Sequence, residues 1–240
     1  MSLESSERCL SLSQRCLRFN RGLLPPLWLL VAAALYGAFL YAPTERVMGE
    51  VQRIFYFHLG SALNSFLAFF AVFVGGIAYL ISKKPVWDAF AAASAEAGIV
   101  LTLIVLTTGP IWAKPVWNTW FPWGDPRVMT ELVLLLIYMA YMILRSSLPE
   151  GEKKYQFAAV FGIIGFVDVP IVWFSIRWWR TIHPVVMTSQ GAALEPEMKT
   201  ALWVSLVAHV VLLVVLVLLR MSIRLHHQVA GELSQALSER

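Results

Sequence analysis

Long apolar runs separated by short polar stretches divide this chain of 240 residues. Six of the runs are long enough to cross a bilayer, which takes about 20 residues in a helix. They cover residues 24–42, 54–82, 88–111, 128–145, 156–176 and 201–221. A span surrounded by lipid must satisfy its own backbone hydrogen bonds, and a helix does so. The pattern predicts an all-α polytopic membrane protein with six transmembrane helices.

Prolines mark several of the expected span ends. The Pro25-Pro26 pair is expected to open the first span, and Pro85 precedes the third. Asp125-Pro126 is typical of a helix start, with an N-cap residue followed by a proline at the first helical position. Pro170 predicts a kink in the fifth span, because proline cannot donate a backbone hydrogen bond.

The same pattern predicts three parts of the chain. We expect an N-terminal segment (1–23), a membrane domain (24–222) and a C-terminal tail (223–240). The first apolar run is too long for the cleaved part of a signal peptide, so we expect it to be retained. Twelve of the 19 Lys and Arg residues fall on the side that holds both termini, against seven on the other. Because cytoplasmic loops carry the excess of such residues, both termini are expected in the cytoplasm.

Composition supports a membrane protein. Hydrophobic residues make up 58% of the chain and charged residues only 14%, with a mean hydropathy of +0.67. Soluble domains are nearer a quarter charged. The net charge of +4 does not indicate nucleic-acid binding, because the basic residues lie between apolar runs instead of along one face. Lipid is the expected surrounding.

The loop between the third and fourth spans carries the most unusual chemistry. It reads GPIWAKPVWNTWFPWGDPRVMTE from Gly109 to Glu131. Its candidate binding residues are Trp112, Lys114, Trp117, Trp120, Trp123, Asp125 and Arg127. Tryptophan is enriched at membrane interfaces, yet such a belt does not require four indoles in one connection. We interpret the loop as a holder for a flat, partly charged ligand.

Two histidines are expected on the same side of the membrane as this loop. His58 lies near the start of the second span, and His183 lies between the fifth and sixth spans. Either one alone is more simply an interfacial polar residue. Together with tryptophans they suit haem, because imidazole is a common axial ligand of haem iron. Trp117, Trp120 and Trp123 are spaced by three, so a short helical turn would place them on one face as a platform.

Cations for the haem propionates complete the hypothesis. Lys114, Arg127, Arg177 and Arg180 are candidates for charge-assisted hydrogen bonds to carboxylates. The alternatives stay open: Arg177 and Arg180 can instead extend to lipid headgroups, and Asp125 can act only as a helix cap.

Other ionisable residues lie inside the spans. Glu96 and Asp168 are costly there and raise the question of a function, although a local polar contact within the bundle is the favoured explanation. His209 is expected to form a hydrogen bond within the bundle.

Three segments resemble the CcmC family of haem-handling membrane proteins, which is related to CcmF and CcsA. They are IFYFHLG, WAKPVWNTWFPWGDPRVMTEL and VPIVWFSIRWWRTIHP, and the second resembles the tryptophan-rich WWD motif. In that motif aspartate usually follows tryptophan directly, whereas here Gly124 separates Trp123 from Asp125. The resemblance implies that His58 and His183 are axial ligands of a haem b held at the outer face of a bacterial cytoplasmic (inner) membrane.

The resemblance also implies partners. These are a CcmE-like haem chaperone that receives the haem, ABC-type subunits like CcmA and CcmB, and a small CcmD-like protein. The only cysteines, Cys9 and Cys16, form no C-x-x-C-H attachment motif, so the haem would be bound non-covalently. The chain has no phosphate-binding loop of the G-x-x-x-x-G-K-[ST] type, so we expect no enzyme, and ATP hydrolysis would belong to a partner. The alternatives are a secondary transporter that uses Glu96 and Asp168, or a structural subunit of a membrane complex.

Overall fold

A computed structural model describes residues 3–183, 187–188, 191–192 and 194–238. It is helical apart from one short antiparallel pair, β1 (Met187–Thr188) and β2 (Gly191–Ala192). The helices are α1 (Leu3–Tyr36), α2 (Ile54–Ser82), α3 (Pro85–Trp117), α4 (Pro126–Ser147), α5 (Glu152–Gly165), α6 (Asp168–Trp178) and α7 (Pro196–Ser238). A π-helical turn (Gly37–Tyr41) extends α1, and a 3-10 turn (Glu50–Arg53) precedes α2. Six helical segments are long and apolar enough to cross a membrane, which confirms the predicted number, with α5 and α6 together forming the fifth.

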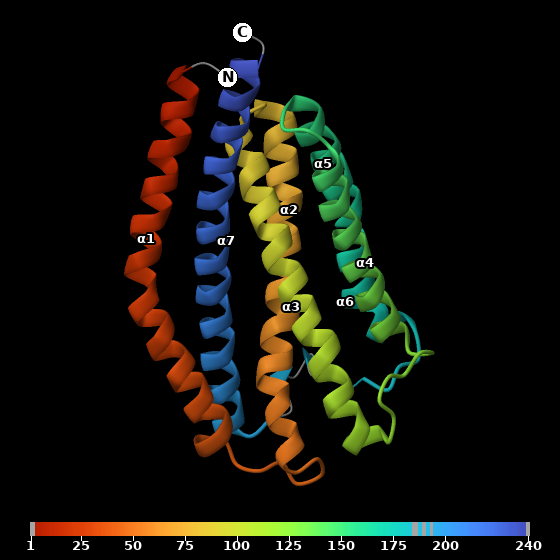
Figure 1. Cartoon of the computed structure of the whole chain (residues 1–240). Coiled ribbons are helices and arrows are strands. Elements are labelled where there is room, and N and C mark those ends of the chain that lie inside the picture. The colour runs from red at the N-terminus through yellow and green to blue at the C-terminus, as the bar shows by residue number, and fades with distance from the viewer. Residues whose placement is uncertain (1–2, 184–186, 189–190, 193, 239–240) are drawn as a thin grey trace.

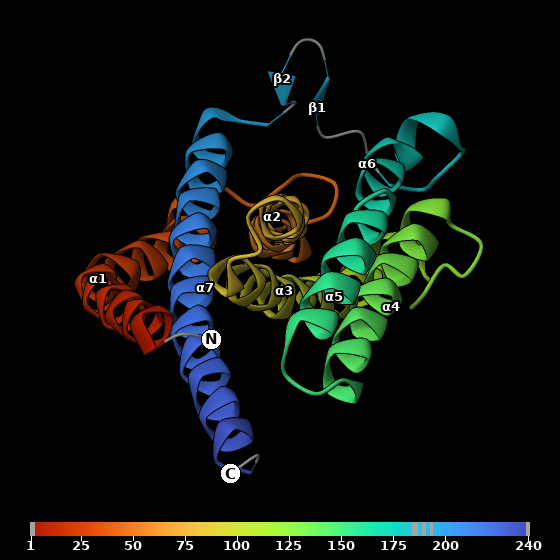
Figure 2. The same cartoon turned by 90° about the horizontal axis from the view of Figure 1, so that it is seen from above.

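The central helices are α2 and α3 (Figures 1 and 2). The long α1–α7 pair lies on one side of them, and α4, α5 and α6 lie on the other. Small residues permit this close packing: a Cβ added at Gly98 of α3 would lie 2.5 Å from the Phe69 ring of α2. Close approach through small residues is the usual way that helices associate in lipid.

The start of the first helix was predicted wrongly. Instead of opening the helix, Pro25 and Pro26 lie inside α1, which already begins at Leu3. Cys9, Ser13 and Cys16 are buried in the seam with α7, so tertiary packing extends the helix through a polar stretch. Prolines are tolerated within membrane helices when neighbouring groups satisfy the freed backbone.

The fifth span is interrupted, as Pro170 predicted. In a regular helix the Phe166 carbonyl would accept from the N–H of residue 170, but Pro170 has no N–H. This carbonyl instead accepts from Val169 N at 3.0 Å. The helix therefore ends at Gly165 and resumes at Asp168. This break lets α6 lie beside α4.

A buried ion pair holds the end of the bundle where α1 starts and α7 ends. Arg145 of α4 donates to both oxygens of Asp88 of α3, at 2.5 and 2.7 Å, and both residues are 3% exposed. Gln228 of α7 donates to the same carboxylate at 3.2 Å. Three helices are thus joined through one carboxylate at the end opposite the tryptophan loop (Figure 1).

Candidate functional site

His58 projects from the second turn of α2. Its Nδ1 lies 3.0 Å from the hydroxyl oxygen of Thr108, and that hydroxyl donates its own proton to the Ile104 carbonyl at 2.6 Å. The Thr108 oxygen must therefore accept from His58, which places the imidazole proton on Nδ1. Nε2 is left with a free lone pair, the form in which histidine binds a metal ion.

His183 lies in the segment after α6 and is held in a similar way. Its Nδ1 lies 3.2 Å from Oδ1 of Asp125 and 3.3 Å from the Thr181 hydroxyl. A carboxylate on one ring nitrogen fixes the tautomer and leaves the other nitrogen available as a ligand. Burial lowers the pKa of His183 below its ordinary value, and the nearby charge of Arg127 lowers it further. The Asp125 carboxylate acts in the opposite direction without outweighing burial. Burial thus favours the neutral form of the ring, the form that binds a metal ion.

Asp125 connects the tryptophan loop to the His183 segment. As predicted, it caps α4, accepting from the backbone N–H groups of Arg127 at 3.0 Å and Val128 at 3.3 Å. It also accepts from the Thr181 hydroxyl at 2.6 Å and from Ile182 N at 3.0 Å. Burial alone would raise the pKa of Asp125, but these hydrogen bonds and His183 outweigh burial and hold the pKa below its ordinary value. Gly124 lies in the turn just before, which closes with a bond from Asp125 N to the Pro122 carbonyl.

Asp125→Ala should destabilise the folded protein by about 2 kcal/mol at pH 7, since it removes a helix cap and charge-assisted hydrogen bonds. Asp125→Asn keeps the cap and should cost less. The pKa of Asp125 is lower in the folded protein than in the unfolded chain, where it is about 3.9. Its contribution to folding stability is therefore fully present above about pH 3.9 and is lost as the pH falls through the folded-state pKa. Thermal unfolding in detergent at several pH values measures this, and equal stability of wild type and Asp125→Ala at pH 7 would contradict it.

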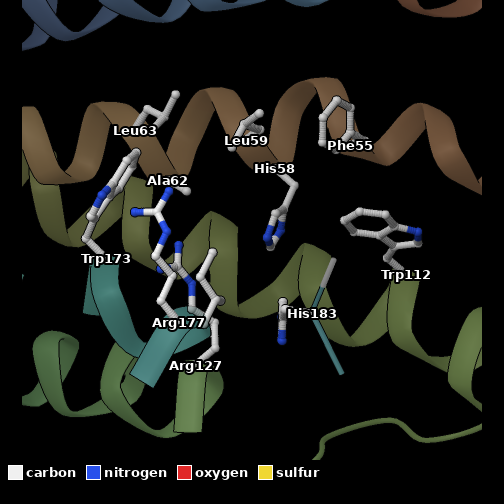
Figure 3. A pocket seen from close by; sticks show the side chains of 11 residues that line it. Phe55, His58, Leu59, Ala62, Leu63, Trp112, Arg127, Trp173, Arg177 and His183 are labelled. Atoms are coloured by element: carbon white, nitrogen blue, oxygen red, sulfur yellow. The ribbon is translucent and has the colours of Figure 1, made fainter. Parts of the chain in front are cut away.

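The two histidines face one cavity of about 830 Å³ between α2, α3, α4 and α6. Figure 3 shows His58 reaching from α2 into the space beside His183. The other residues that line this cavity include Phe55, Trp112, Arg127, Trp173 and Arg177. A second cavity of about 480 Å³ adjoins it at His58, Arg127 and His183. Cavities that are mainly apolar with a few polar groups are typical of small-molecule sites.

The four predicted tryptophans divide into two pairs. Trp112 is 5% exposed and meets the His58 ring edge-on, with centroids 5.8 Å apart. Trp117 lies 5.7 Å from the His183 ring and lines the second cavity. Trp120 and Trp123 are 61% and 70% exposed and line neither cavity.

The predicted helical turn through this loop is therefore wrong. Helix α3 ends at Trp117, because Asn118 adopts a left-handed conformation with φ 55°. No helix is assigned between that residue and Pro126.

Two of the four predicted cations reach the cavity. Arg127 lines both cavities, donates to the Val172 carbonyl at 2.5 Å and lies 5.7 Å from the Phe66 ring centre. Arg177 is exposed and lines the first cavity. Lys114 donates to Asn118 at 3.0 Å and lines neither cavity, and Arg180 lines a separate shallow depression beside Asp125.

Several residues of the site were not predicted from the sequence. Thr108 and Thr181 orient the histidines, but a threonine in an apolar helix or a loop carries no distinctive pattern. Trp173 lines the cavity but reads as an interfacial tryptophan. Glu131 could have been predicted as a site residue, because it follows Arg127 by four residues and so lies on the same face of the helix.

The ionisable residues inside the spans mostly have local partners. Glu96 accepts from Arg220 and Arg224 of α7, so the expected polar contact within the bundle is confirmed. His209 Nδ1 lies 2.7 Å from the Ser205 carbonyl, as expected. Asp168 is buried, and its Oδ2 has no hydrogen-bond partner within the described part of the chain.

These features define a multi-pass helical membrane protein with a two-histidine, aromatic-lined cavity at one end of the bundle. The family model described as "CcmC: Heme exporter protein C" matches residues 1–235. The chain belongs to this heme exporter protein C family.

Similar proteins agree with that assignment. "Heme exporter protein C" of Escherichia coli (strain K12) is 32% identical over 183 residues, which cover 76% of this chain and 74% of that protein. A "putative cytochrome c biosynthesis ccmC-like mitochondrial protein" of Marchantia polymorpha is 34% identical over 173 residues, 72% of this chain and 73% of that protein. The relatives thus include both bacterial and mitochondrial proteins, and their names concern haem export and cytochrome c biosynthesis.

Proposed function

We propose that this protein binds haem b non-covalently, with His58 and His183 as the two axial ligands, and passes it to a haem chaperone during the assembly of c-type cytochromes. The observation that carries the proposal is the pair of imidazoles at one cavity, each held through Nδ1, with no hydrogen-bond partner for either Nε2 among the described residues. The histidines come from distant parts of the sequence, and each has its own orienting partner. A hydrogen bond on the nitrogen that does not bind the metal is typical of metal-ligating histidines.

The surroundings of the histidines suit the rest of the haem. Aromatic rings of Phe55, Trp112 and Trp117 provide apolar surface, and Arg127 and Arg177 are available to the propionates. A haem iron held by two protein ligands has no open position for a reacting molecule, so we propose transfer instead of catalysis.

The exposed side chains of Trp120 and Trp123 supply a surface for the partner that takes the haem. The Lys and Arg distribution supports cytoplasmic termini, and thus a site at the outer face of the cytoplasmic membrane. Membership of the CcmC family is the ground on which we propose a CcmE-like chaperone as the recipient, together with CcmA-, CcmB- and CcmD-like subunits.

A haem titration of the detergent-purified protein tests the proposal. We expect a Soret band that saturates at one haem per chain, with the low-spin spectrum of two histidine ligands. A protein that gives no Soret band, and instead carries another solute in a flux that depends on Glu96 and Asp168, would be a secondary transporter.

Replacing Trp117 separates aromatic surface from iron ligation. Stacking on an aromatic ring is worth about 1–3 kcal/mol, and about 1.4 kcal/mol is a tenfold change in affinity. Trp117→Leu should therefore weaken haem binding by about tenfold while the two-histidine spectrum persists. Trp120→Leu and Trp123→Leu should lower chaperone loading more than binding. A changed axial-ligand spectrum in Trp117→Leu would contradict this division.

A further inference from the structure

The two cavities meet at the histidine pair. His58, Arg127 and His183 line both, so a flat ligand whose metal is bound by the two imidazoles would extend one edge into each cavity. The larger cavity, of about 830 Å³, and the smaller one, of about 480 Å³, would therefore receive opposite edges of the same molecule.

The two cavities differ in charge. The larger one has Arg177 in addition to Arg127. The smaller one has a carboxyl group, that of Glu131. Otherwise its lining is largely apolar, with Val105, Pro110 and Phe121 among its residues.

Glu131 is buried without a hydrogen-bond partner. It is 3% exposed, and neither carboxyl oxygen has a partner within the described residues. Its charged neighbours are Arg127, one turn earlier on α4, and Asp168 at the start of α6. An unpartnered buried carboxyl group is costly, so its presence at a binding cavity calls for a role.

We infer that Glu131 is a specificity-determining residue, which directs the propionate edge of haem into the cavity with Arg177 and excludes porphyrins that carry carboxylates on the opposite edge. This inference rests on the proposed function. A propionate in this water-poor cavity would lose its hydration, and Glu131 would repel it when its own carboxyl group is ionised. The vinyl and methyl groups of the other haem edge bring neither cost, and they fit the smaller apolar cavity.

Coprohaem provides the test, because it has two propionates where haem b has its two vinyl groups. We would titrate the detergent-purified full chain with each haem and record the ratio of the two dissociation constants. Wild type should prefer haem b by at least about tenfold, which corresponds to about 1.4 kcal/mol. Glu131→Gln removes the carboxylate at nearly constant size, and it should reduce this preference by about tenfold, mainly through tighter coprohaem binding.

Two matched variants control for general effects of buried charge. Asp168→Asn neutralises the neighbouring carboxyl group, which lines neither cavity, and should leave the preference unchanged. Arg177→Gln should weaken the binding of haem b and of coprohaem by a similar factor, since both place propionates in the larger cavity. A Glu131→Gln protein that binds both haems with the wild-type ratio would overturn the inference.

If Glu131→Gln fails to fold, haem binding by the wild-type protein alone still tests the inference. Mesohaem, which has ethyl groups in place of the vinyl groups, should bind within about threefold of haem b, because only carboxylates are excluded. Equal affinity of wild type for haem b and coprohaem would overturn the inference and leave the proposed function intact. A wild-type protein that binds none of these haems would instead contradict the proposed function itself.

Discussion

Replacing His58 or His183 by alanine should abolish the two-histidine haem spectrum. Each imidazole supplies one axial ligand, so a single replacement leaves a five-coordinate iron with a shifted Soret band and much weaker retention. We expect less than about a tenth of the wild-type haem to remain after purification, since loss of a ligand bond exceeds the roughly 1.4 kcal/mol of a tenfold change. Absorption spectra of the purified proteins measure both quantities.

Exogenous imidazole and a third histidine make this test specific. Imidazole added to His58→Ala or His183→Ala should occupy the vacated position and restore the six-coordinate spectrum. His227→Ala should leave the spectrum unchanged, because His227 lies in α7 at the other end of the bundle. An unchanged spectrum in His58→Ala or His183→Ala would show that the altered residue is not a ligand.

Breaking the buried Arg145–Asp88 pair should produce the largest loss of stability. Asp88→Ala leaves the Arg145 guanidinium, 3% exposed, without its carboxylate. Removal of one partner from a buried ion pair costs about 3–5 kcal/mol, since the remaining charge is uncompensated. Unfolding in a denaturing detergent should therefore begin at a markedly lower concentration than for wild type.

An exposed ion pair and a double variant complete that experiment. Arg46 and Glu195 lie 3.7 Å apart, with side chains 88% and 48% exposed, so Arg46→Gln should change stability by less than about 1 kcal/mol. Replacing both members of the buried pair, with Asp88→Leu and Arg145→Met, should recover much of the loss, because no lone charge remains. If Asp88→Ala were as stable as Arg46→Gln, the pair would have no role in holding the bundle.

The sequence predicted the elements that depend on local pattern. Apolar run length indicated six spans, Asp125-Pro126 indicated the start of α4, and Pro170 indicated the break in the fifth span. Sidedness of the connections was enough to place His58 and His183 at the same end of the bundle, where both line one cavity.

Features that depend on contacts between distant segments could not be predicted in this way. The helical start of α1 at Leu3 depends on burial against α7, which no local pattern reveals. The spacing of Trp117, Trp120 and Trp123 suggested a helical face, but Asn118 ends the helix after the first of them. Likewise Thr108 is informative only once α2 and α3 are packed together.

The shared carboxyl group of Asp125 makes the tryptophan loop and the His183 segment one mechanical unit. Besides His183 itself, four groups donate to it, and they lie on both sides: Arg127 and Val128 in the first turn of α4, Thr181 and Ile182 beside the histidine. The loop that carries the exposed indoles is thus coupled to the His183 segment through hydrogen bonds to this one carboxylate.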